Sequence, residues 1–358
     1  MSVLALCTDA YGGRGGIAQY NRDLLDALAV AFPRQQVTLL LRLCPDDVGN
    51  LPPTVNLDRA ALGGKVAYAL RALWQGWRRY DLILCGHINL LPLAQTLGRL
   101  SGTPVVLLCY GIEVWRPPSA HSPRRMAALA GVVSISRITE QRLRQWAPAT
   151  PAAAILPNAI HLEYYRQGDR PHALVQRYGL QGRRVLMTMG RMVGRERAKG
   201  FDEVLEALPR LPDDVVYLLA GDGPDRERLR ARAAELGVSQ RAVFTGYVDA
   251  TEKADHYLLA DLYVMPSRGE GFGFVLLEAL AAGIPCVGST RDGTREALDD
   301  GTLGELVDPD DRDALVAAIL RGLARPRGRP PGLAQFATPA WVARTREIFA
   351  PWLSPGGA

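Results

Sequence analysis

The segment from residue 261 to residue 280 reads Asp-Leu-Tyr-Val-Met-Pro-Ser-Arg-Gly-Glu-Gly-Phe-Gly-Phe-Val-Leu-Leu-Glu-Ala-Leu. Its start, 261–265, is a short apolar run of the kind that forms a buried parallel strand. A glycine-rich turn follows, and from about Gly273 apolar residues dominate, which predicts a helix. A strand, a loop and a helix in this order belong to a βαβ unit, so the segment predicts a parallel sheet.

Similar short runs rich in Val, Leu and Ile recur along the rest of the chain. They lie at 3–8, 37–43, 81–85, 104–109 and 131–135 in the first half and at 184–190, 214–220, 242–246 and 284–288 in the second. Amphipathic helical patterns such as 202–209 and 225–236 separate them. Because crossovers between parallel strands are right-handed, the pattern predicts an α/β protein with two doubly wound, Rossmann-like domains facing a cleft.

The domain boundaries follow from length and composition. A chain of 358 residues is longer than one hydrophobic core usually supports. Polar residues gather at 166–171, and Pro and Gly gather at 325–333. We therefore predict an N-terminal domain over 1–165, a C-terminal domain over 166–335, and a final segment, 336–358, whose helix near 338–353 returns to the first domain.

Composition and charge exclude several classes of protein. Five scattered cysteines without a Cys-x-x-Cys pair are typical of reduced core residues. No apolar run is long enough to cross a bilayer and no basic leader begins the chain, so we expect a cytoplasmic protein. Residues 1–165 carry 16 Lys and Arg against 10 Asp and Glu, but show no nucleic-acid-binding signature. This excess favours an anionic substrate or membrane surface, and not nucleic acid.

Three loops after predicted strands carry glycine or charge in unusual amounts. Gly12-Gly-Arg-Gly-Gly16 precedes a helix from about Ile17, where backbone amides and the helix N-terminus suit an anion, although a flexible connection would look the same. The loop 190–202 holds four cations, which suit a diphosphate or a solvated basic loop equally well. Gly221-Asp-Gly-Pro224 alone indicates only a helix start.

The loop after 261–265 carries two glutamates of different character. Glu270 lies in the glycine-rich turn, whereas Glu278 lies inside the following helix with apolar neighbours on both sides. A buried carboxylate needs a hydrogen-bond partner, and ligand hydroxyls are one such partner. An exposed helical acid is the alternative for Glu278, and its apolar flanks make that interpretation the weaker one.

With these loops in view, the chain resembles the retaining glycosyltransferases of family 4, which have the GT-B fold. The family signature of two glutamates separated by seven residues is matched by Glu270 and Glu278. Further matches are the glycine loop at 12–16, Pro157-Asn158, Gly190-Arg191, Gly221-Asp-Gly-Pro224 and Ala281-Ala-Gly-Ile-Pro285. The resemblance spans nearly the whole chain.

The resemblance implies roles for individual residues. Arg191 and Lys199 would hold the diphosphate of a nucleotide-sugar donor, and the amides of Gly15 and Gly16 would approach it from the other domain. Glu278 would bind the ribose, and Glu270 the transferred sugar. The remaining donor-binding candidates are Gly221, Gly271, Phe272, Gly273 and Phe274.

Two departures from the family pattern leave alternatives open. The interval from Arg191 to Lys199 is longer than usual, so Arg195 or Arg197 would share the phosphate role. Tyr110 stands where the family often has a histidine, and His87 is the candidate to replace it beside the sugar.

The resemblance also implies a reaction that retains anomeric configuration, with GDP-mannose or UDP-glucose as the donor and a sugar or lipid-linked saccharide as the acceptor. Arg191, Lys199 and a helix N-terminus would neutralise the leaving diphosphate, so no metal and no cofactor is expected. The Asp-x-Asp at Asp308-Pro-Asp310 is interpreted as capping the helix 312–322. A sugar-nucleotide epimerase and a non-catalytic nucleotide-sugar-binding module are the alternatives, and hydrolysis is disfavoured because the two glutamates lie close in sequence on one side of the site.

One helical pattern, 65–79, has two interpretations. Val66, Leu70, Leu73, Trp74 and Trp77 share one face, and Lys65, Arg71, Arg78 and Arg79 lie opposite. A crossover helix that packs its apolar face on the sheet is preferred, because every βα domain needs such helices. The unexplained charge of the first domain keeps a second interpretation open, in which the helix attaches the protein peripherally to the anionic inner membrane leaflet, beside a lipid-linked acceptor.

Overall fold

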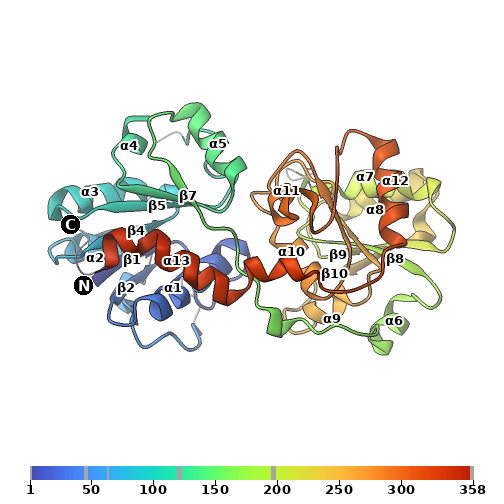
Figure 1. Cartoon of the computed structure of the whole chain (residues 1–358), viewed down its shortest axis with the longest axis horizontal. Helices are drawn as coiled ribbons and strands as arrows, with labels where there is room; N and C mark the ends of the chain where they lie inside the picture. The colour runs from blue at the N-terminus through green and yellow to red at the C-terminus, as the bar shows by residue number, and fades with distance from the viewer. Residues whose placement is uncertain (1, 44–46, 63, 119–122, 195–198, 355–358) are drawn as a thin grey trace. The chain divides into compact units, whose positions relative to one another are not determined.

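A computed structural model describes residues 2–43, 47–62, 64–118, 123–194 and 199–354. The chain divides into two compact units (Figure 1). The first comprises Met1–Ala159 with Thr338–Ala358, and the second comprises Ile160–Ala337. The sequence places the boundaries after residues 165 and 335. In the structure they lie at Ala159 and Ala337, and Ile160 forms a parallel bridge with Ala337 inside the second unit.

Within its described residues, the first unit is built on a parallel sheet of seven strands in the order β3-β2-β1-β4-β5-β6-β7. The strands are β1 (Ser2–Cys7), β2 (Gln36–Leu41), β3 (Val55–Leu57), β4 (Leu82–Gly86), β5 (Val105–Cys109), β6 (Gly131–Ser134) and β7 (Ala153–Ile155). The helices are α1 (Gly16–Ala31), α2 (Lys65–Gln75), α3 (Leu91–Ser101), α4 (Pro123–Ala127) and α5 (Arg137–Trp146). The central strands are buried along their length, which explains their continuous apolar runs.

The second unit repeats the architecture with a parallel sheet in the order β10-β9-β8-β11-β12-β13. Its strands are β8 (Arg184–Met189), β9 (Val215–Ala220), β10 (Ala242–Gly246), β11 (Leu262–Val264), β12 (Cys286–Ser289) and β13 (Glu305–Val307). Its α-helices are α6 (His172–Tyr178), α7 (Phe201–Ala207), α8 (Arg226–Glu235), α9 (Lys253–Tyr257), α10 (Phe274–Ala281), α11 (Thr294–Ala297) and α12 (Arg312–Leu323). Two doubly wound α/β sheets are therefore confirmed.

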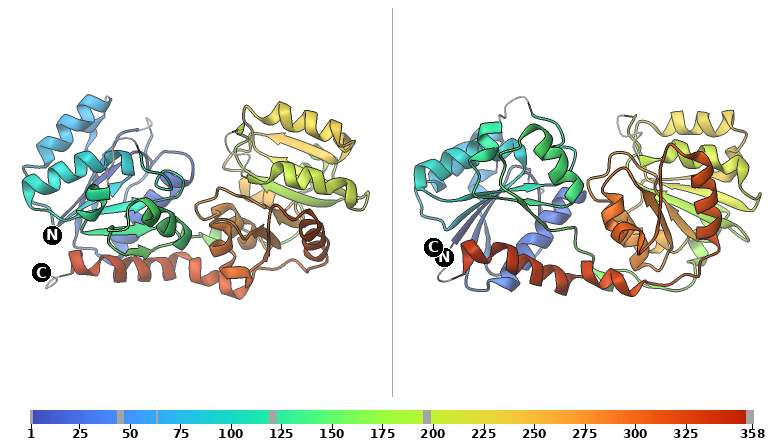
Figure 2. Two further views of the ribbon diagram at one scale, coloured as in Figure 1. Left: turned by 90° about the horizontal axis from the view of Figure 1, so that it is seen from above. Right: turned by 45° about the horizontal axis from the view of Figure 1, so that its top comes forward.

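The final helix, α13 (Thr338–Leu353), lies along the first unit beside α1 (Figure 2). The ring of Trp341 packs edge-on against Tyr20 at 5.6 Å between centroids, and its indole nitrogen donates to the carbonyl of Pro157. Farther along, the Gln35 side chain donates to the carbonyl of Leu353 at 2.8 Å. These contacts bury one face of the helix, which holds Trp341, Thr345, Phe349 and Leu353, and make the helix part of the first unit.

Helix α2 corrects one expectation. It ends at Gln75. The apolar face that we expected to pack on the sheet is instead exposed to solvent; it consists of Val66, Leu70, Leu73, Trp74 and Trp77. The side that packs on the sheet holds Tyr68 and Ala72 instead. Gln75 is buried on the same side, and its amide donates to the Asp58 carboxylate at 2.6 Å.

Two expectations from composition concern cysteines and membrane spans. Cys7, Cys85, Cys109 and Cys286 are buried free thiols, as expected, whereas Cys44 lies outside the described residues. Among the helices that the structure describes, none is long and apolar enough to cross a bilayer.

Candidate active site

The predicted donor-site residues of the second unit follow neighbouring strands. Lys199 lies beyond β8, Gly221 follows β9, and Glu270 follows β11. Because all these strands run parallel, their carboxyl ends lie along one edge of the sheet, where open α/β sheets bind ligands. Residues from separate loops therefore come together at this edge.

Lys199 and Glu270 form the central ion pair at the edge. The ammonium group of Lys199 donates to Oε1 of Glu270, and each side chain keeps about a fifth of its surface exposed, at 20%. The aliphatic stem of Lys199 passes over Gly190, where any side chain would crowd it. The structure thus places a cation and a carboxylate side by side, both partly accessible to a ligand.

Asp292, which sequence analysis did not single out, holds the Glu270 loop. Its Oδ2 accepts the backbone N–H of Glu270 at 2.8 Å and the Ser267 hydroxyl at 2.7 Å, and its Oδ1 accepts the hydroxyl of Thr294 at 2.7 Å. Burial raises the pKa of the Asp292 carboxyl above its ordinary value, and these hydrogen bonds offset only part of that effect. The signal that points to Asp292 is its position after β12, at the same sheet edge.

Backbone also meets backbone at this edge. A Cβ on Gly293 would lie 2.1 Å from the carbonyl oxygen of Gly271, and the Gly293 N–H donates to the Glu270 carbonyl at 2.9 Å. A Cβ on Gly221 would likewise lie 2.1 Å from the carbonyl oxygen of Gly190. Glycine is required at both positions by the close approach of neighbouring loops, which is a structural role.

Glu278 is buried, as its apolar flanks predicted, but its partners come from the protein. Oε1 accepts the hydroxyl of Tyr165 at 2.6 Å and is paired with the Lys253 ammonium, and Oε2 accepts the hydroxyl of Tyr257 at 2.7 Å. Ligand hydroxyls were one partner that the sequence suggested for this carboxylate, and contacts of high sequence separation, which the local pattern does not show, already satisfy it. The role of Glu278 in ribose binding stays a prediction.

The two phenylalanines of the loop differ in environment. Phe272 is buried and packs edge-on against Phe336 at 5.8 Å between ring centroids, so its ring belongs to the core. Phe274 opens α10 after the N-cap residue Gly273 and is half-buried, with the Lys253 ammonium 5.8 Å from its ring centroid. Only Phe274 therefore offers a ring with exposed surface.

The basic loop after β8 is described in part. Arg191 is exposed and forms no ion pair with any residue that the structure describes. Arg195 and Arg197, the alternatives for the phosphate role, lie outside the described residues.

The glycine loop of the first unit follows β1 and leads into α1. Gly15 is the N-cap residue and Gly16 begins the helix. The Arg22 guanidinium, from α1, donates to the carbonyls of Ala10 and Gly13 at 2.9 and 2.8 Å, which holds the loop against the helix. The two candidate amides therefore sit on a loop of defined shape.

Tyr110 and His87 lie after β5 and β4, at the corresponding edge of the first sheet. Tyr110 is buried, and its hydroxyl lies 2.6 Å from Oδ1 of Asn21 and 2.9 Å from the carbonyl oxygen of Gly86. His87 is half-buried, and its Nδ1 accepts the N–H of Asn89 at 3.1 Å. Burial, with Arg42 nearby, lowers the pKa of His87. A neutral His87 therefore carries its proton on Nε2, as a hydrogen-bond donor.

Asp9 is a second residue that sequence analysis missed. It follows β1, its Oδ1 is buried and accepts no hydrogen bond from the described residues, and burial raises the pKa of the carboxyl. The backbone carbonyl oxygen of Asp9 accepts a hydrogen bond from the side-chain amide of Asn21 at 2.8 Å. Because Asn21 also contacts the Tyr110 hydroxyl, this bond links Asp9 to Tyr110. An unsatisfied buried oxygen at a ligand-binding edge is a candidate acceptor for a ligand hydroxyl.

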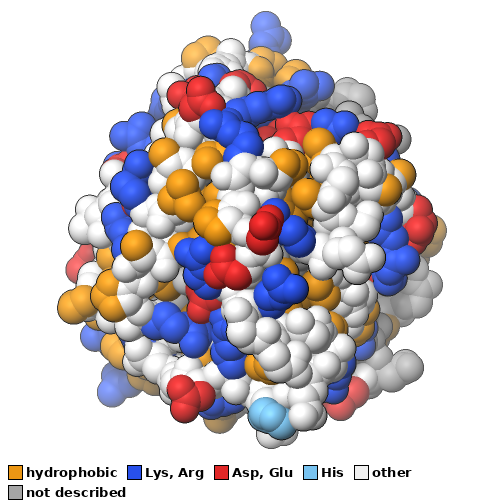
Figure 3. Space-filling model, turned by 90° about the vertical axis from the view of Figure 1, so that its right-hand side faces the viewer, with side chains coloured by type: hydrophobic (Ala, Val, Ile, Leu, Met, Phe, Trp, Pro, Cys, Tyr) orange, Lys and Arg blue, Asp and Glu red, His pale blue; other side chains and the backbone are white. Residues whose placement is uncertain are grey.

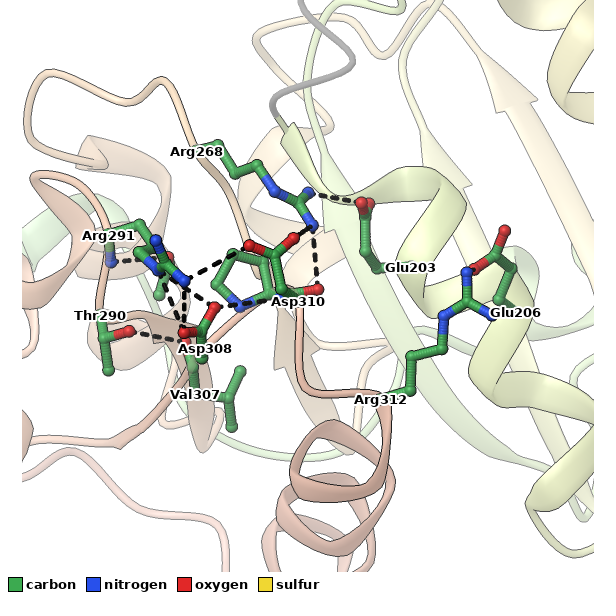
Figure 4. Close-up of polar contacts among 11 residues, drawn as sticks. Glu203, Glu206, Arg268, Thr290, Arg291, Val307, Asp308, Asp310 and Arg312 are labelled. Atoms are coloured by element: carbon green, nitrogen blue, oxygen red, sulfur yellow. Dashed lines mark hydrogen bonds and ion pairs between the residues drawn. The ribbon is translucent and has the colours of Figure 1, made fainter.

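Asp308 and Asp310 do not cap α12 as expected. Asp311 is the N-cap residue and accepts the N–H of Ala314 at 2.9 Å. Asp308 pairs with Arg291 at 2.6 Å, and Asp310 pairs with Arg268 at 2.7 Å (Figure 4). Both aspartates form ion pairs with these arginines instead, because the loops after β11, β12 and β13 lie side by side at this edge of the sheet.

Ion pairs of this kind continue into a pocket of about 650 Å³ in the second unit. Arg268 reaches Glu203, and Arg312 and Arg232 both reach Glu206. Since acids and bases neutralise each other there, the pocket offers no net charge to an anionic ligand. The described residues contain no group of three or more His, Cys, Asp or Glu that is arranged to hold a metal ion.

Known proteins with related sequences place the chain in a family. A family model described as glycosyl transferases group 1 matches residues 183–325. A GDP-mannose-dependent alpha-(1-6)-phosphatidylinositol monomannoside mannosyltransferase of Mycolicibacterium smegmatis is 34% identical over 276 residues, which are 72% of this chain and 71% of that protein. The chain belongs to the group 1 glycosyltransferases. As a member of this family it is a glycosyltransferase, and the predicted resemblance is confirmed.

Two further similarities concern the sequence and the fold. The lipopolysaccharide core biosynthesis glycosyltransferase LpsE of Rhizobium meliloti is 38% identical over 175 residues, which are 46% of this group 1 glycosyltransferase and 49% of LpsE. The Anabaena protein HepE, crystallised with UDP and glucose, has a TM-score of 0.73 at 19% identity and covers 98% of this chain and 99% of its own. The latter likeness confirms the GT-B fold.

Proposed function

We propose that this glycosyltransferase moves a hexose from a nucleotide-diphosphate sugar to a sugar or lipid-linked saccharide acceptor, in polysaccharide or glycolipid assembly. GDP-mannose is the preferred donor, and a UDP-sugar is the alternative. The preference is supported by the relative that is 34% identical, whose name includes GDP-mannose dependence. The lipid-linked acceptor is supported by the phosphatidylinositol monomannoside in the same name.

The Lys199–Glu270 pair is the observation that carries this proposal. A diphosphate brings negative charge that an ammonium and a guanidinium neutralise, and the exposed Arg191 begins the loop that ends at Lys199. The carboxylate oxygens of Glu270, beside Lys199, accept hydrogen bonds from hydroxyl groups, which a hexose supplies. The cations thus suit the diphosphate of the donor, and the carboxylate beside them suits the sugar that the diphosphate carries.

Glu278 takes part in donor binding by a partial exchange of partners. Both partners of Oε1 are partly accessible, since the Lys253 side chain is 32% exposed and Tyr165 is half-buried, whereas the Tyr257 ring on Oε2 is fully buried. We propose that ribose hydroxyls replace Lys253 on Oε1 while Tyr257 keeps its bond to Oε2. The buried tyrosine then fixes the carboxylate in one rotamer, which lowers the entropic cost of binding.

In the first unit, we propose that His87 rather than Tyr110 contacts a ligand hydroxyl, with the Gly15 and Gly16 amides directed at an anion. The support is that the Tyr110 hydroxyl is buried against Asn21, while His87 is half-buried with Nδ1 already engaged. Tyr110 is then a positioning residue, since Asn21 in turn bonds the Asp9 backbone of the glycine loop.

The proposed reaction retains configuration and needs no metal. The bond between the anomeric carbon and the diphosphate oxygen breaks, and the acceptor hydroxyl forms its bond on the same face and gives its proton to the departing phosphate. Arg191 and Lys199 stabilise the charge that develops on the diphosphate, which is the task that a divalent cation performs elsewhere.

The test uses the purified full chain. Calorimetric titration with GDP and with UDP identifies the base, and transfer from GDP-mannose to phosphatidylinositol monomannoside, with NMR of the product, reports the anomeric configuration. We expect GDP to bind more tightly and the α-linked product to form. An inverted product would contradict retention, interconversion of sugar nucleotides without acceptor would identify an epimerase, and binding without turnover on any saccharide acceptor would identify a binding module.

A further inference from the structure

The solvent-facing side of α2 and of the turn after it forms an apolar surface, here called the α2 outer face. Trp77 is 90% exposed, Val66 73%, Leu70 62%, Trp74 45% and Leu73 38%. These residues recur at intervals of three and four, so they form a single stripe on the helix. Single exposed apolar residues are common, but a contiguous stripe with two tryptophans marks an interaction surface.

The charge around this stripe is mainly basic. Residues 59–80 contain Arg59, Lys65, Arg71, Arg78 and Arg79 and no Asp or Glu. Two acids flank the segment: Asp58 accepts hydrogen bonds from Arg71 and Gln75, and the half-buried Asp81 accepts the backbone N–H of Ser2. The next segment, 82–112, contains Arg99 and no acid. A surface with this excess of basic side chains is complementary to an anionic one.

The tryptophans and arginines are organised together. The Arg71 guanidinium lies 3.8 Å from the ring centroid of Trp74, and that of Arg78 lies 4.6 Å from it. This stacking holds the guanidinium groups of Arg71 and Arg78 against the Trp74 ring. This arrangement suits a membrane interface, because the interface offers headgroup charge and acyl-chain surface at nearly the same depth.

Helix α8, another exposed helix, is built differently. There Arg228 pairs with Asp202 and Asp225, and Arg232 pairs with Glu206 and Glu235. The face seen in Figure 3 accordingly shows basic and acidic side chains next to one another. On α2 and the turn after it, Arg71 pairs with Asp58. Lys65, Arg78 and Arg79 form no ion pair with the residues that the structure describes, so their charge is available to a partner.

We propose that the α2 outer face docks the protein on a bilayer that contains anionic lipid. The helix has 11 residues and a length of about 16 Å, so it lies in the plane of the interface and does not span it. Trp74, Trp77 and Leu70 enter the headgroup region, while Arg78, Arg79 and Lys65 contact lipid phosphates. The proposal stands on this surface alone and does not depend on the donor or the acceptor.

Vesicle flotation of the full chain tests the proposal. We expect binding to vesicles of phosphatidylglycerol and phosphatidylcholine, little binding to phosphatidylcholine alone, and release by salt. Arg78→Glu/Arg79→Glu should weaken binding about tenfold or more, whereas the control Arg210→Glu/Arg230→Glu, with the same change in net charge on exposed residues of the second unit, should not.

The apolar half of the surface has its own comparison. Trp77→Ser should also weaken vesicle binding severalfold, while Tyr164→Ser, at a 67% exposed position of the second unit, should leave it unchanged. Thermal unfolding and GDP titration of each variant separate docking from folding and from donor binding. Absence of binding to anionic vesicles at low salt would overturn the proposal. So would equal losses in the controls, or self-association of the chain that Trp77→Ser abolishes without any vesicle binding.

Discussion

The carboxylate of Asp292 accepts a hydrogen bond from the backbone N–H of Glu270 at 2.8 Å. Asp292, which lies on a different loop, therefore positions the residue that pairs with Lys199. The Gly293 N–H donates to the Glu270 carbonyl at 2.9 Å, so both the N–H and the carbonyl of Glu270 are bonded to the loop after β12. The location of Glu270 thus depends on the loop after β12 as much as on its own.

Asp292→Asn should disorder this arrangement, because an amide offers one acceptor oxygen where the carboxylate offers two to Ser267, Glu270 and Thr294. We expect a loss of stability of about 1–3 kcal/mol and a fall in kcat with little change in donor affinity. Urea unfolding and steady-state kinetics measure both. Asp313→Asn, at a side chain that is 87% exposed, is the control, and an unchanged kcat in Asp292→Asn would contradict the positioning role.

Glu270→Ala should reduce transfer by about 100-fold or more, since it removes the proposed sugar contact and leaves Lys199 without its carboxylate. Glu270→Gln keeps the shape and should retain donor binding. Initial rates at saturating donor, with calorimetric titration of the nucleotide, distinguish the two effects. Turnover close to that of the unaltered protein in Glu270→Ala would refute the site assignment.

Glu278→Ala should affect stability as well as donor binding. The Tyr257 hydroxyl is buried with Glu278 as its acceptor, so the variant leaves it unsatisfied at a cost of about 1–3 kcal/mol. Glu278→Gln preserves an acceptor and should lose affinity for the nucleotide with a smaller loss of stability. Differential scanning calorimetry with and without GDP measures both quantities, and an unchanged melting temperature for Glu278→Ala would argue against the buried role.

His87 predicts a pH dependence of folding. Burial lowers its pKa below the ordinary 6.5, so between the two values the unfolded chain binds more protons than the folded one. The contribution of His87 to the free energy of unfolding is therefore present above pH 6.5 and is lost as pH falls through the folded-state pKa. His87→Asn, which keeps a side-chain acceptor for the Asn89 N–H, should lack this dependence. Urea unfolding at several pH values tests it, and a difference in stability between the two proteins that stays constant with pH would contradict it.

Chelation should leave activity intact, because Arg191 and Lys199 are proposed to neutralise the diphosphate without a metal. Transfer assays with and without EDTA test this expectation. Loss of activity in EDTA that manganese or magnesium restores would refute it, whereas Lys199→Ala should lower kcat whether or not metal is present.

The strand pattern was highly predictable, since buried parallel strands are continuously apolar and each predicted run overlaps a strand. The three-residue strands β3, β7 and β13 lie outside the predicted runs, at Val55–Leu57, Ala153–Ile155 and Glu305–Val307. Such short pairings depend on the neighbouring strand more than on local composition. The same limit applies to the side chains of the site, whose partners lie far away in the chain.

From its sequence alone, this chain determined its fold, its family and the loops on which a ligand site must lie, because periodicity, glycine placement and motif spacing are local properties. Only the tertiary structure decided which atoms meet. It gave Glu278 two tyrosines and a lysine as partners, brought Asp292 to Glu270, and turned the tryptophans of α2 toward solvent. Each of these outcomes depends on packing between residues distant in sequence, and a helical periodicity shows that a face is apolar without showing what covers it.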